Sequence, residues 1–529
     1  MSPEPHPLPA GFPPWPVRGA RGAVASADAR ATSAGLDVLA TGGNAVDSAI
    51  ATNAVMAVVA PHLCGLGGDL FAMVHDAGAT YSLNASGRAG SGADPAALRE
   101  EGHAQMPFRH DVRSVTVPGC VDGWAALHER FGSLPLTTLL QPAIDLAEAG
   151  FAASPGLSDA VRRLDGPGRQ ALSPLQSATK DGRVRLPGVA RTLRAIARHG
   201  RDGFYGGEFG AGLLALGAGL FDPDDLSRIQ ADWVAPLSAR VWGVDLHTIP
   251  PNSQGYLALG AARLAEQLGL PSDPEDPAHA HLLIECATAA GVDRPSVLHE
   301  YADGEALLAT IDGRGGWVDR DRASRRTTSV RDGDTTYLCV VDGTGSGVSL
   351  IQSNAAGFGS LLAEPNTGIN LHNRGLGFSL TPGHPAELAP GRRPPHTLAP
   401  LLATRDGALA GVLGTMGGDA QPQILLQLLA RLFVHHQSPH QAISAGRWAL
   451  RGSDTGFETW SANDGRIVQL EGQTPQEWSG ALAARGHRTE RLDAYDSTFG
   501  HAHAILRAAD GTLSGYADPR TGVGSCAAI

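Results

Sequence analysis

The sequence predicts a fold of mixed α+β composition, because it contains both segments typical of helices and segments typical of paired strands. A β-branched and aromatic run at 334–341 and an alternating run at 348–354 flank a glycine-rich turn, which predicts a β-hairpin. Residues 45–60 are apolar on all sides, which predicts a buried helix. Strand-like segments return near the end of the chain, at 502–506 and 513–517.

The length of 529 residues allows three or four average domains or one large α/β unit, and no internal repeat divides it. A hydrophobic content of 42% is enough for a sizeable core. The formal net charge of −12 argues against a nucleic-acid partner, because the chain has no basic surplus to replace counterions. The most apolar stretch, 45–60, is too short and too polar to span a membrane.

Residues 1–20 are rich in proline and lack the apolar core of a secretory signal, so we expect a flexible N-terminal arm and a cytoplasmic protein. The five cysteines are scattered without CxxC spacing. That pattern fits a reducing compartment and predicts no structural zinc.

The first third of the chain predicts two helices, a glycine-rich turn and a strand pair. Asn44 is a suitable N-cap for the helix at 45–60, and another helix is expected at 27–40. The turn at 64–69 either cradles an anion or packs tightly against a sheet, and its glycine order favours the second. Strands are expected at 71–74 and 80–84.

Arg88 follows the second of these strands, where binding residues often lie. It is either an ordinary exposed charge or a partner for a ligand carboxylate.

The remaining elements follow from the same patterns. We expect a strand at 114–118, helices at 121–131 and 139–149, and mainly helices and loops over 155–300, with a turn-rich exception at 249–255. Further along, we expect a strand or strand end at 368–374, a loop at 381–395, a strand pair within 398–413 and a helix at 423–434.

Gly417 and Gly418 lie in a turn immediately before the last of these helices. Backbone N–H groups at such a position form a natural oxyanion site. A plain tight turn is the alternative, and the spacing alone does not separate the two.

The hairpin places residue 335 opposite residues 353 to 355, where facing Cβ atoms lie roughly 4.5–5.5 Å apart. Thr335 and Ser353 are therefore expected within hydrogen-bonding distance. The preceding segment, 303–334, is polar and rich in turns. Either this segment is a solvated loop that leads into a strand, or the chain is cut between Asp334 and Thr335, which would make Thr335 an N-terminal nucleophile.

Other kinds of chemistry find little support. The chain has no H-E-x-x-H motif for zinc and no G-x-S-x-G nucleophile elbow. Histidines occur in three close pairs, namely His279 and His281, His435 and His436, and His501 and His503. We expect these pairs to be structural, and we predict no metal and no cofactor.

Several short motifs occur together in an order that resembles the gamma-glutamyltransferase family of N-terminal nucleophile hydrolases. The likeness covers about residues 20 to 529. Its motifs are Gly42-Gly43-Asn44-Ala45-Val46-Asp47, 65–71, Val117-Pro118-Gly119, Gln141-Pro142-Ala143, Thr335-Thr336-Tyr337 with Val340-Val341-Asp342, Gly357-Phe358-Gly359-Ser360, Gly417-Gly418 and Asp518-Pro519-Arg520.

The resemblance implies a four-layer αββα sandwich, with two stacked antiparallel sheets between helical layers. It also implies a zymogen that cuts itself before Thr335 into a large subunit, 21–334 after the arm, and a small subunit, 335–529, which stay interlocked as a heterodimer. A dimer of such heterodimers is compatible with it. Ser353 matches the second hydroxyl of the family, and Gly417 and Gly418 match its oxyanion hole.

The substrate side departs from the family. The residues that hold the α-amine of a gamma-glutamyl group align with Arg374 and Gly377, and those that help to hold its carboxylate align with His396, Thr397 and the region of Arg88. Asn354 is a further candidate for substrate binding. An arginine repels an α-ammonium, so an acyl group with a carboxylate and no α-amine fits better.

We therefore predict an autoprocessing amidohydrolase or acyltransferase that acts on a small amide through an acyl-Thr335 intermediate. The acyl group would be glutaryl-like or gamma-glutamyl-like. The first alternative is a genuine gamma-glutamyltransferase or glutathione hydrolase. The second is a binding protein that has the fold but no catalytic activity.

Overall fold

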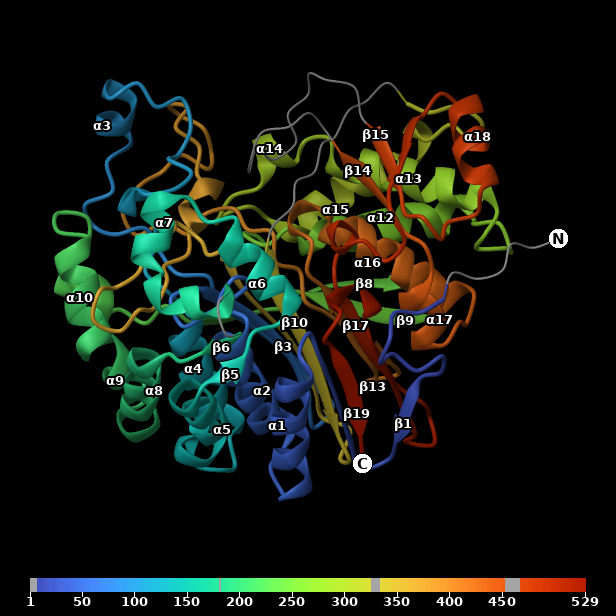
Figure 1. Cartoon of the computed structure of the whole chain (residues 1–529). Coiled ribbons are helices and arrows are strands. Elements are labelled where there is room, and N and C mark those ends of the chain that lie inside the picture. Colours follow the sequence, from blue (N-terminus) through green and yellow to red (C-terminus); the bar gives the residue numbers. More distant parts are fainter. Residues whose placement is uncertain (1–6, 180–181, 325–333, 452–466) are drawn as a thin grey trace.

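The computed structural model describes residues 7–179, 182–324, 334–451 and 467–529. Two seven-stranded antiparallel sheets form its centre (Figure 1). The first sheet has the order β19 (Ser525–Ala528), β2 (Gly22–Ser26), β10 (Asp334–Asp342), β11 (Gly347–Ala355), β3 (Asp69–Asp76), β4 (Ala79–Ala85) and β7 (Asp232–Val234). The second has the order β1 (Val17–Gly19), β18 (Leu513–Ala517), β17 (Ala502–Arg507), β13 (Ala408–Thr415), β12 (Leu401–Arg405), β9 (Val244–Thr248) and β8 (Leu237–Val241).

Helices cover the outer face of each sheet. The first sheet is covered mainly by α1 (Ala29–Ala40), α2 (Ala45–Val59), α4 (Cys120–Phe131), α5 (Leu136–Ala149) and α8 (Pro187–His199). The second is covered by α12 (Gly255–Leu268), α13 (Pro277–Gly291), α15 (Gly304–Asp312), α16 (Gln421–Leu429), α17 (Pro439–Ser444) and α18 (Glu477–Ala484).

Shorter elements lie at the periphery. They are the helices α3 (Pro95–Glu100), α6 (Pro155–Arg162), α7 (Gly166–Ala171), α9 (Asp202–Tyr205), α10 (Glu208–Leu216), α11 (Pro223–Ser227) and α14 (Arg294–Val297), and the strands β5 (Phe151–Ala152), β6 (Arg183–Val184), β14 (Trp448–Arg451), β15 (Ile467–Leu470) and β16 (Arg488–Arg491).

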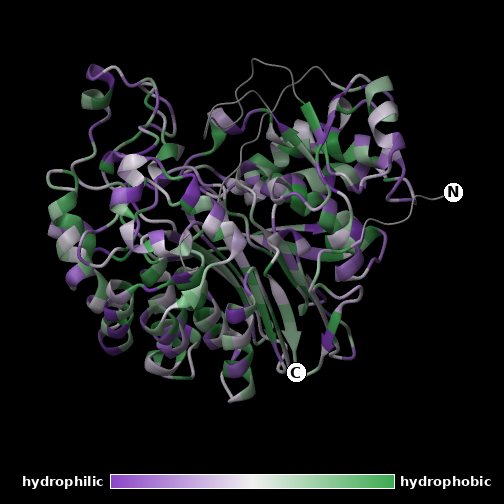
Figure 2. Ribbon diagram, viewed as in Figure 1, coloured by the Kyte–Doolittle hydropathy of each residue, from purple (hydrophilic) through white to green (hydrophobic). Residues whose placement is uncertain are grey.

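Three hydrophobic cores separate four layers, which confirms the αββα sandwich. One core joins the first helical layer to the first sheet, a second joins the two sheets, and a third joins the second sheet to its helices. Strands alternate between the cores: Tyr337 and Cys339 face the other sheet, whereas Leu338 and Val340 face the helices. The central strands carry much of the hydrophobic colour in Figure 2.

Helix α2 confirms the expectation of a buried helix. Every one of its residues is buried, and Asn44 caps its N-terminus together with Asp47 in a capping box. The helix is apolar all round because it packs between α1, α5 and the strand β10.

Three expectations about secondary structure were wrong. Residues 114–118 end a 3₁₀ turn and continue as a segment outside both sheets, with a backbone hydrogen bond from the Val117 N–H to the Arg88 carbonyl but no strand ladder. Residues 368–374 form only one isolated bridge, between Asn370 and Ala363. The region 155–300 is mainly helices and loops, as expected, but it also contains the hairpin β8–β9, whose two-residue turn has positive φ at both positions. The expected arm ends in strand β1, which pairs with β18.

Candidate active site

The hairpin β10–β11 brings Thr335 opposite Ser353, as the sequence predicted. The Thr335 hydroxyl donates a hydrogen bond of 3.1 Å to the Ser353 hydroxyl, and both residues are buried. The register of the strand pair shifts between Asp334 and Thr335, at the expected cleavage site. This hydroxyl pair lies at the open ends of the two strands, far from the turn that joins them.

Both hydroxyls face the other sheet. Thr335 precedes Tyr337 by two residues and shares its face, and Ser353 shares the face of Ile351. The next strand, β3, places Asp69 directly opposite Ser353. Three neighbouring strands therefore present a threonine, a serine and an aspartate side by side on one face.

Asp69 holds a buried cluster of charged and polar side chains. Its Oδ2 accepts a hydrogen bond of 2.6 Å from Arg374 Nε and one of 2.8 Å from His396 Nε2, and His372 Nδ1 lies 3.6 Å away. Burial opposes ionisation of Asp69, but Arg374 and His396 lower the pKa of its carboxyl well below the usual value. Asp69 is therefore a buried anion that fixes the position of Arg374.

Burial and the nearby Arg374 lower the pKa of His396 to about 4. His396 is therefore neutral at physiological pH, and Arg374 is the cation that balances Asp69. Arg374 also donates from Nη1 to the Thr397 hydroxyl at 3.2 Å. Its Nη2 is buried and has no partner among the described residues, so this N–H group remains available to a ligand.

The glycine turn lies at the same end of the sandwich as Thr335. A Cβ at Gly414, at the end of β13, would stand 2.2 Å from the Tyr337 ring, so only glycine allows this close packing. Three residues later, Gly417 and Gly418 have φ of +135° and +54°, which L-residues with side chains rarely adopt. Helix α16 begins at Gln421, directly after the turn.

Two buried side chains that the sequence analysis missed hold this turn. Gln254 Nε2 donates to the Gly418 carbonyl at 3.1 Å and to the Thr397 carbonyl at 2.7 Å. Arg294 forms a buried ion pair of 3.2 Å with Asp419. Gln254 therefore links the candidate oxyanion turn to the segment that carries His396 and Thr397.

The structure does not bring Arg88 or Asn354 to this face. Arg88 already forms ion pairs with Glu300, at 2.5 Å, and Asp232, at 2.9 Å. Asn354 follows Ser353 and so points to the helical side of the sheet, where its amide donates to the Pro61 carbonyl. The expectation that Arg88 and Asn354 bind a substrate stays a prediction.

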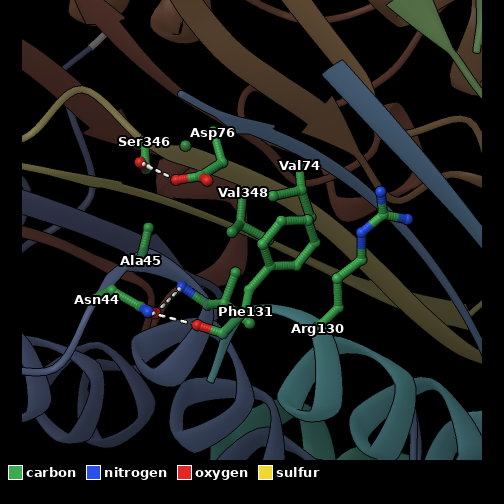
Figure 3. A pocket seen from close by; sticks show the side chains of 10 residues that line it. Asn44, Ala45, Val74, Asp76, Arg130, Phe131, Ser346 and Val348 are labelled. Carbon is green, nitrogen blue, oxygen red and sulfur yellow. Dashed lines mark hydrogen bonds between the residues drawn. The ribbon is translucent and has the colours of Figure 1, made fainter. Parts of the chain in front are cut away.

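A pocket beside the hairpin turn lies at the far end of the same sheet (Figure 3). Asp76 lines it and accepts a hydrogen bond of 2.6 Å from Ser346, near the turn. Strand β10 ends at Asp342, seven residues beyond Thr335, which is a length of roughly 23 Å at about 3.3 Å per residue. The pocket is therefore separate from the hydroxyl pair.

Among the described residues, Asp69, Gln254 and Arg294 are the site residues that sequence reasoning missed. Asp69 gave a faint signal, since an aspartate at the start of an apolar strand is unusual. Gln254 lies in the turn-rich segment 249–255, which stood out by composition only. No helix in the described part of the chain is long and apolar enough to cross a membrane.

Comparisons with known proteins agree over nearly the whole chain. A family model described as gamma-glutamyltranspeptidase matches residues 31–528. The glutathione hydrolase-like YwrD proenzyme of Bacillus subtilis is 32% identical, over 95% of this chain and 98% of the relative. The oxamate amidohydrolase proenzyme of Klebsiella pneumoniae is 33% identical, over 93% and 95%.

A solved structure gives the same result. The cephalosporin acylase from Bacillus halodurans superimposes with a TM-score of 0.88 at 34% identity, and the match covers 100% of this chain and 99% of the acylase. Sequence and fold therefore agree along the full length of the protein. The chain belongs to the gamma-glutamyltranspeptidase family of N-terminal nucleophile enzymes.

Proposed function

We propose that the protein is an autoprocessing amidohydrolase whose nucleophile is Thr335, and that its substrates carry a carboxylate on the acyl group. The observation that carries the proposal is the buried Asp69–Arg374 pair on the same face as Thr335 and Ser353. The proenzyme names of the relatives from Bacillus subtilis and Klebsiella pneumoniae support cleavage of the precursor.

Cleavage of the precursor needs no other chain. The Thr335 hydroxyl attacks the carbonyl carbon of Asp334, the peptide C–N bond breaks, and the hydroxyl proton passes to the Thr335 nitrogen. Water then hydrolyses the resulting ester, which leaves a carboxylate at Asp334 and restores the Thr335 hydroxyl. The two products stay together because β10 and β11 lie between β2 and β3 in one sheet, and we propose that they form an interlocked heterodimer.

The new α-amine serves as the base for amide hydrolysis. An α-amine has a pKa of about 7.7–8.0 in short peptides, so part of it is neutral at physiological pH. It accepts the Thr335 hydroxyl proton while Oγ1 attacks the substrate carbonyl, and the N–H groups of Gly417 and Gly418 stabilise the oxyanion. The proton passes to the leaving amine, an acyl-Thr335 ester remains, and water releases the acid.

Arg374 determines which acyl groups bind. Its Nε is committed to Asp69, whereas its unpartnered Nη2 is available to a substrate carboxylate. The guanidinium would repel an α-ammonium, and Asp69, already bound to Arg374 and His396, is a poor partner for one. Amides of short dicarboxylic or oxo acids fit this arrangement, and the Klebsiella pneumoniae relative is named for one such substrate, oxamate.

A substrate panel tests the proposal. The wild type should hydrolyse oxamate or glutaryl p-nitroanilide with a kcat/KM far above that for acetyl p-nitroanilide. Hydrogen bonds to charged groups contribute about 1.5–3 kcal/mol, so Arg374→Met should lower kcat/KM for the acidic substrates by about 10- to 100-fold and leave the acetyl substrate little changed. Arg374→Lys preserves the charge beside Asp69 and serves as the conservative variant.

Arg88→Met is the matched control, because Arg88 is the other arginine that the sequence suggested. Equal losses for acidic and neutral substrates in Arg374→Met, or loss of selectivity in Arg88→Met instead, would contradict the assignment. Faster turnover of a gamma-glutamyl anilide than of the glutaryl anilide would identify the protein as a genuine gamma-glutamyl hydrolase or transferase.

A further inference from the structure

Three side chains of types that can bind a metal meet in the second helical layer, and none of them belongs to the candidate active site. His281 and Glu285 lie one turn apart on α13, and His487 lies between α18 and β16. All three are buried, and one ligand atom from each lies within 4.8 Å of the others. We propose that His281, Glu285 and His487 bind a divalent transition-metal ion, with Zn²⁺ the best match to this ligand set.

The hydrogen bonds of His281 orient it as a metal ligand. Its Nε2 lies 2.9 Å from the Asp319 carbonyl oxygen, which can only accept, so Nε2 carries the proton. In the neutral ring, Nδ1 then presents a lone pair toward His487 Nε2, 2.8 Å away. Metal-ligating histidines usually donate their second N–H to a carbonyl or carboxylate in this way.

The dimensions and chemistry fit zinc. Zinc–nitrogen bonds of about 2.0–2.1 Å in a tetrahedron separate ligand atoms by about 3.3 Å, so the two rings need to move apart by only about 0.5 Å. Two imidazoles and a carboxylate suit Zn²⁺, whereas Mg²⁺ and Ca²⁺ prefer oxygen ligands throughout. The backbone N–H of Ser324 donates a hydrogen bond to the Glu285 carboxylate. The Ser324 hydroxyl is buried and has no partner among the described residues, so this hydroxyl is suited to bind a metal-bound water.

The cluster also joins segments on both sides of the proposed cleavage site. His281 and Glu285 precede residue 334, whereas His487 follows it. The backbone N–H of Ala323 donates to the Arg485 carbonyl at 2.7 Å, so the same two segments already touch here. If the chain is cut as proposed above, the metal would join helix α13 of the large subunit to the small subunit.

Metal analysis tests the site without reference to activity. The purified protein is equilibrated with ZnCl₂, freed of unbound ion and analysed by mass spectrometry of the elements. The wild type should retain about one zinc per chain, and His487→Gln and Glu285→Gln should each retain less than about one tenth of that amount.

His279→Gln is the matched control. His279 lies on the same helix and also pairs with a histidine, His435, at 3.0 Å, but it is not part of the three-residue cluster. Its substitution should leave the zinc content unchanged. Wild-type protein without retained zinc, or full retention in His487→Gln, would reduce the cluster to a hydrogen-bonded histidine pair and overturn the proposal.

A second measurement uses only wild-type protein, in case the variants fail to fold. Co²⁺ in place of zinc should give the visible absorption of a tetrahedral site, and added Zn²⁺ should abolish it. The thermal midpoint should fall on chelation and recover with Zn²⁺. The variant Thr335→Ala, which should remain uncut, should retain the same amount of zinc, because the metal site does not depend on the cleavage. Absence of the cobalt spectrum in both proteins would refute the proposed metal site.

Discussion

Asp69 is the ion-pair partner that positions the candidate substrate arginine, Arg374. Its carboxylate and the Arg374 guanidinium are 0% and 2% exposed, and the Nε–Oδ2 distance is 2.6 Å. A buried ion pair adds little stability compared with a well-packed pair of apolar side chains. Loss of one partner, however, leaves a buried charge without a counterion and is strongly destabilising. The cost of an Asp69 substitution should therefore depend on whether Arg374 is present.

We predict that Asp69→Asn lowers stability by about 3–5 kcal/mol, because the Arg374 cation then lies buried without a counterion. The double variant Asp69→Asn with Arg374→Met should recover part of this loss, since neither charge remains. Thermal midpoints of the four proteins in the cycle measure the coupling. Additive effects, with no recovery in the double variant, would show that the two charges do not depend on each other.

At the residue scale, the sequence predicted Thr335 and Ser353 correctly as a pair because only 18 positions separate them. One turn fixes their geometry. Asp69 and Arg374 are 305 positions apart and meet only through the packing of the complete fold. Arg88 is 144 positions from Asp232 and 212 from Glu300, so the sequence could not show that this arginine already has partners.

The glycine turn between β13 and α16 is the element that determines the candidate oxyanion hole. Its N–H groups act only if the peptide planes keep one orientation. Gln254 restrains the Gly418 carbonyl, and Arg294 restrains the neighbouring Asp419. The turn is thus supported from distant positions in the chain as well as by its own hydrogen bond from the Ala420 N–H to the Gly417 carbonyl.

We predict that Gln254→Leu lowers kcat about tenfold and leaves KM nearly unchanged, because it disturbs groups that act mainly in the transition state. Removal of a direct donor usually costs about 10²–10³, so an indirect effect should be smaller. Gln427→Leu is the control: this buried glutamine bonds to Gln423 and Trp448 instead. Equal losses of kcat in both variants would reduce Gln254 to a general structural role.

At the element scale, the sequence predicted a helix or hairpin correctly where that segment contains its own capping, turn or hydrophobic pattern. Helix α2 combines an N-cap with a continuous apolar run, and the hairpin β10–β11 has alternation and a glycine turn. The hairpin β8–β9 was missed because Trp242-Gly243 is not a typical turn pair, although both residues adopt positive φ. Strand β1 was missed because three residues carry too little pattern.

At the scale of the whole molecule, buried histidines link stability to pH. Burial lowers the pKa of His396 and His501 to about 4, and that of His62, His279 and His503 to about 3. An exposed histidine in the unfolded chain has a pKa near 6.5. Between about pH 6.5 and 4, these histidines therefore bind protons in the unfolded chain but not in the folded protein.

The sign follows from this difference: stability should fall as the pH falls from about 6.5 toward 4, because protons bind preferentially to the unfolded chain. We predict a steady decrease of the urea midpoint from pH 7 to 4.5 at constant ionic strength. Paired carboxylates such as Asp69 contribute mainly at lower pH. A midpoint that stays constant between pH 7 and 5 would show that these histidines are accessible to protons in the folded state.

The four-layer architecture was predictable only through the resemblance to a family. Composition and periodicity left the number of domains open, because local patterns do not say which strands share a sheet. The order β2–β10–β11–β3 joins segments from both halves of the chain. That interleaving allows a cut before Thr335 to leave the fold intact.

The cut itself is the central claim, and the masses and N-terminal sequences of the purified chains test it most directly. We predict two chains, one that ends at Asp334 and one that begins Thr335-Thr336-Tyr337, and a single 54.6 kDa chain for Thr335→Ala. A fully active preparation that contains only the uncut chain, or one whose second chain begins at another residue, would contradict the account.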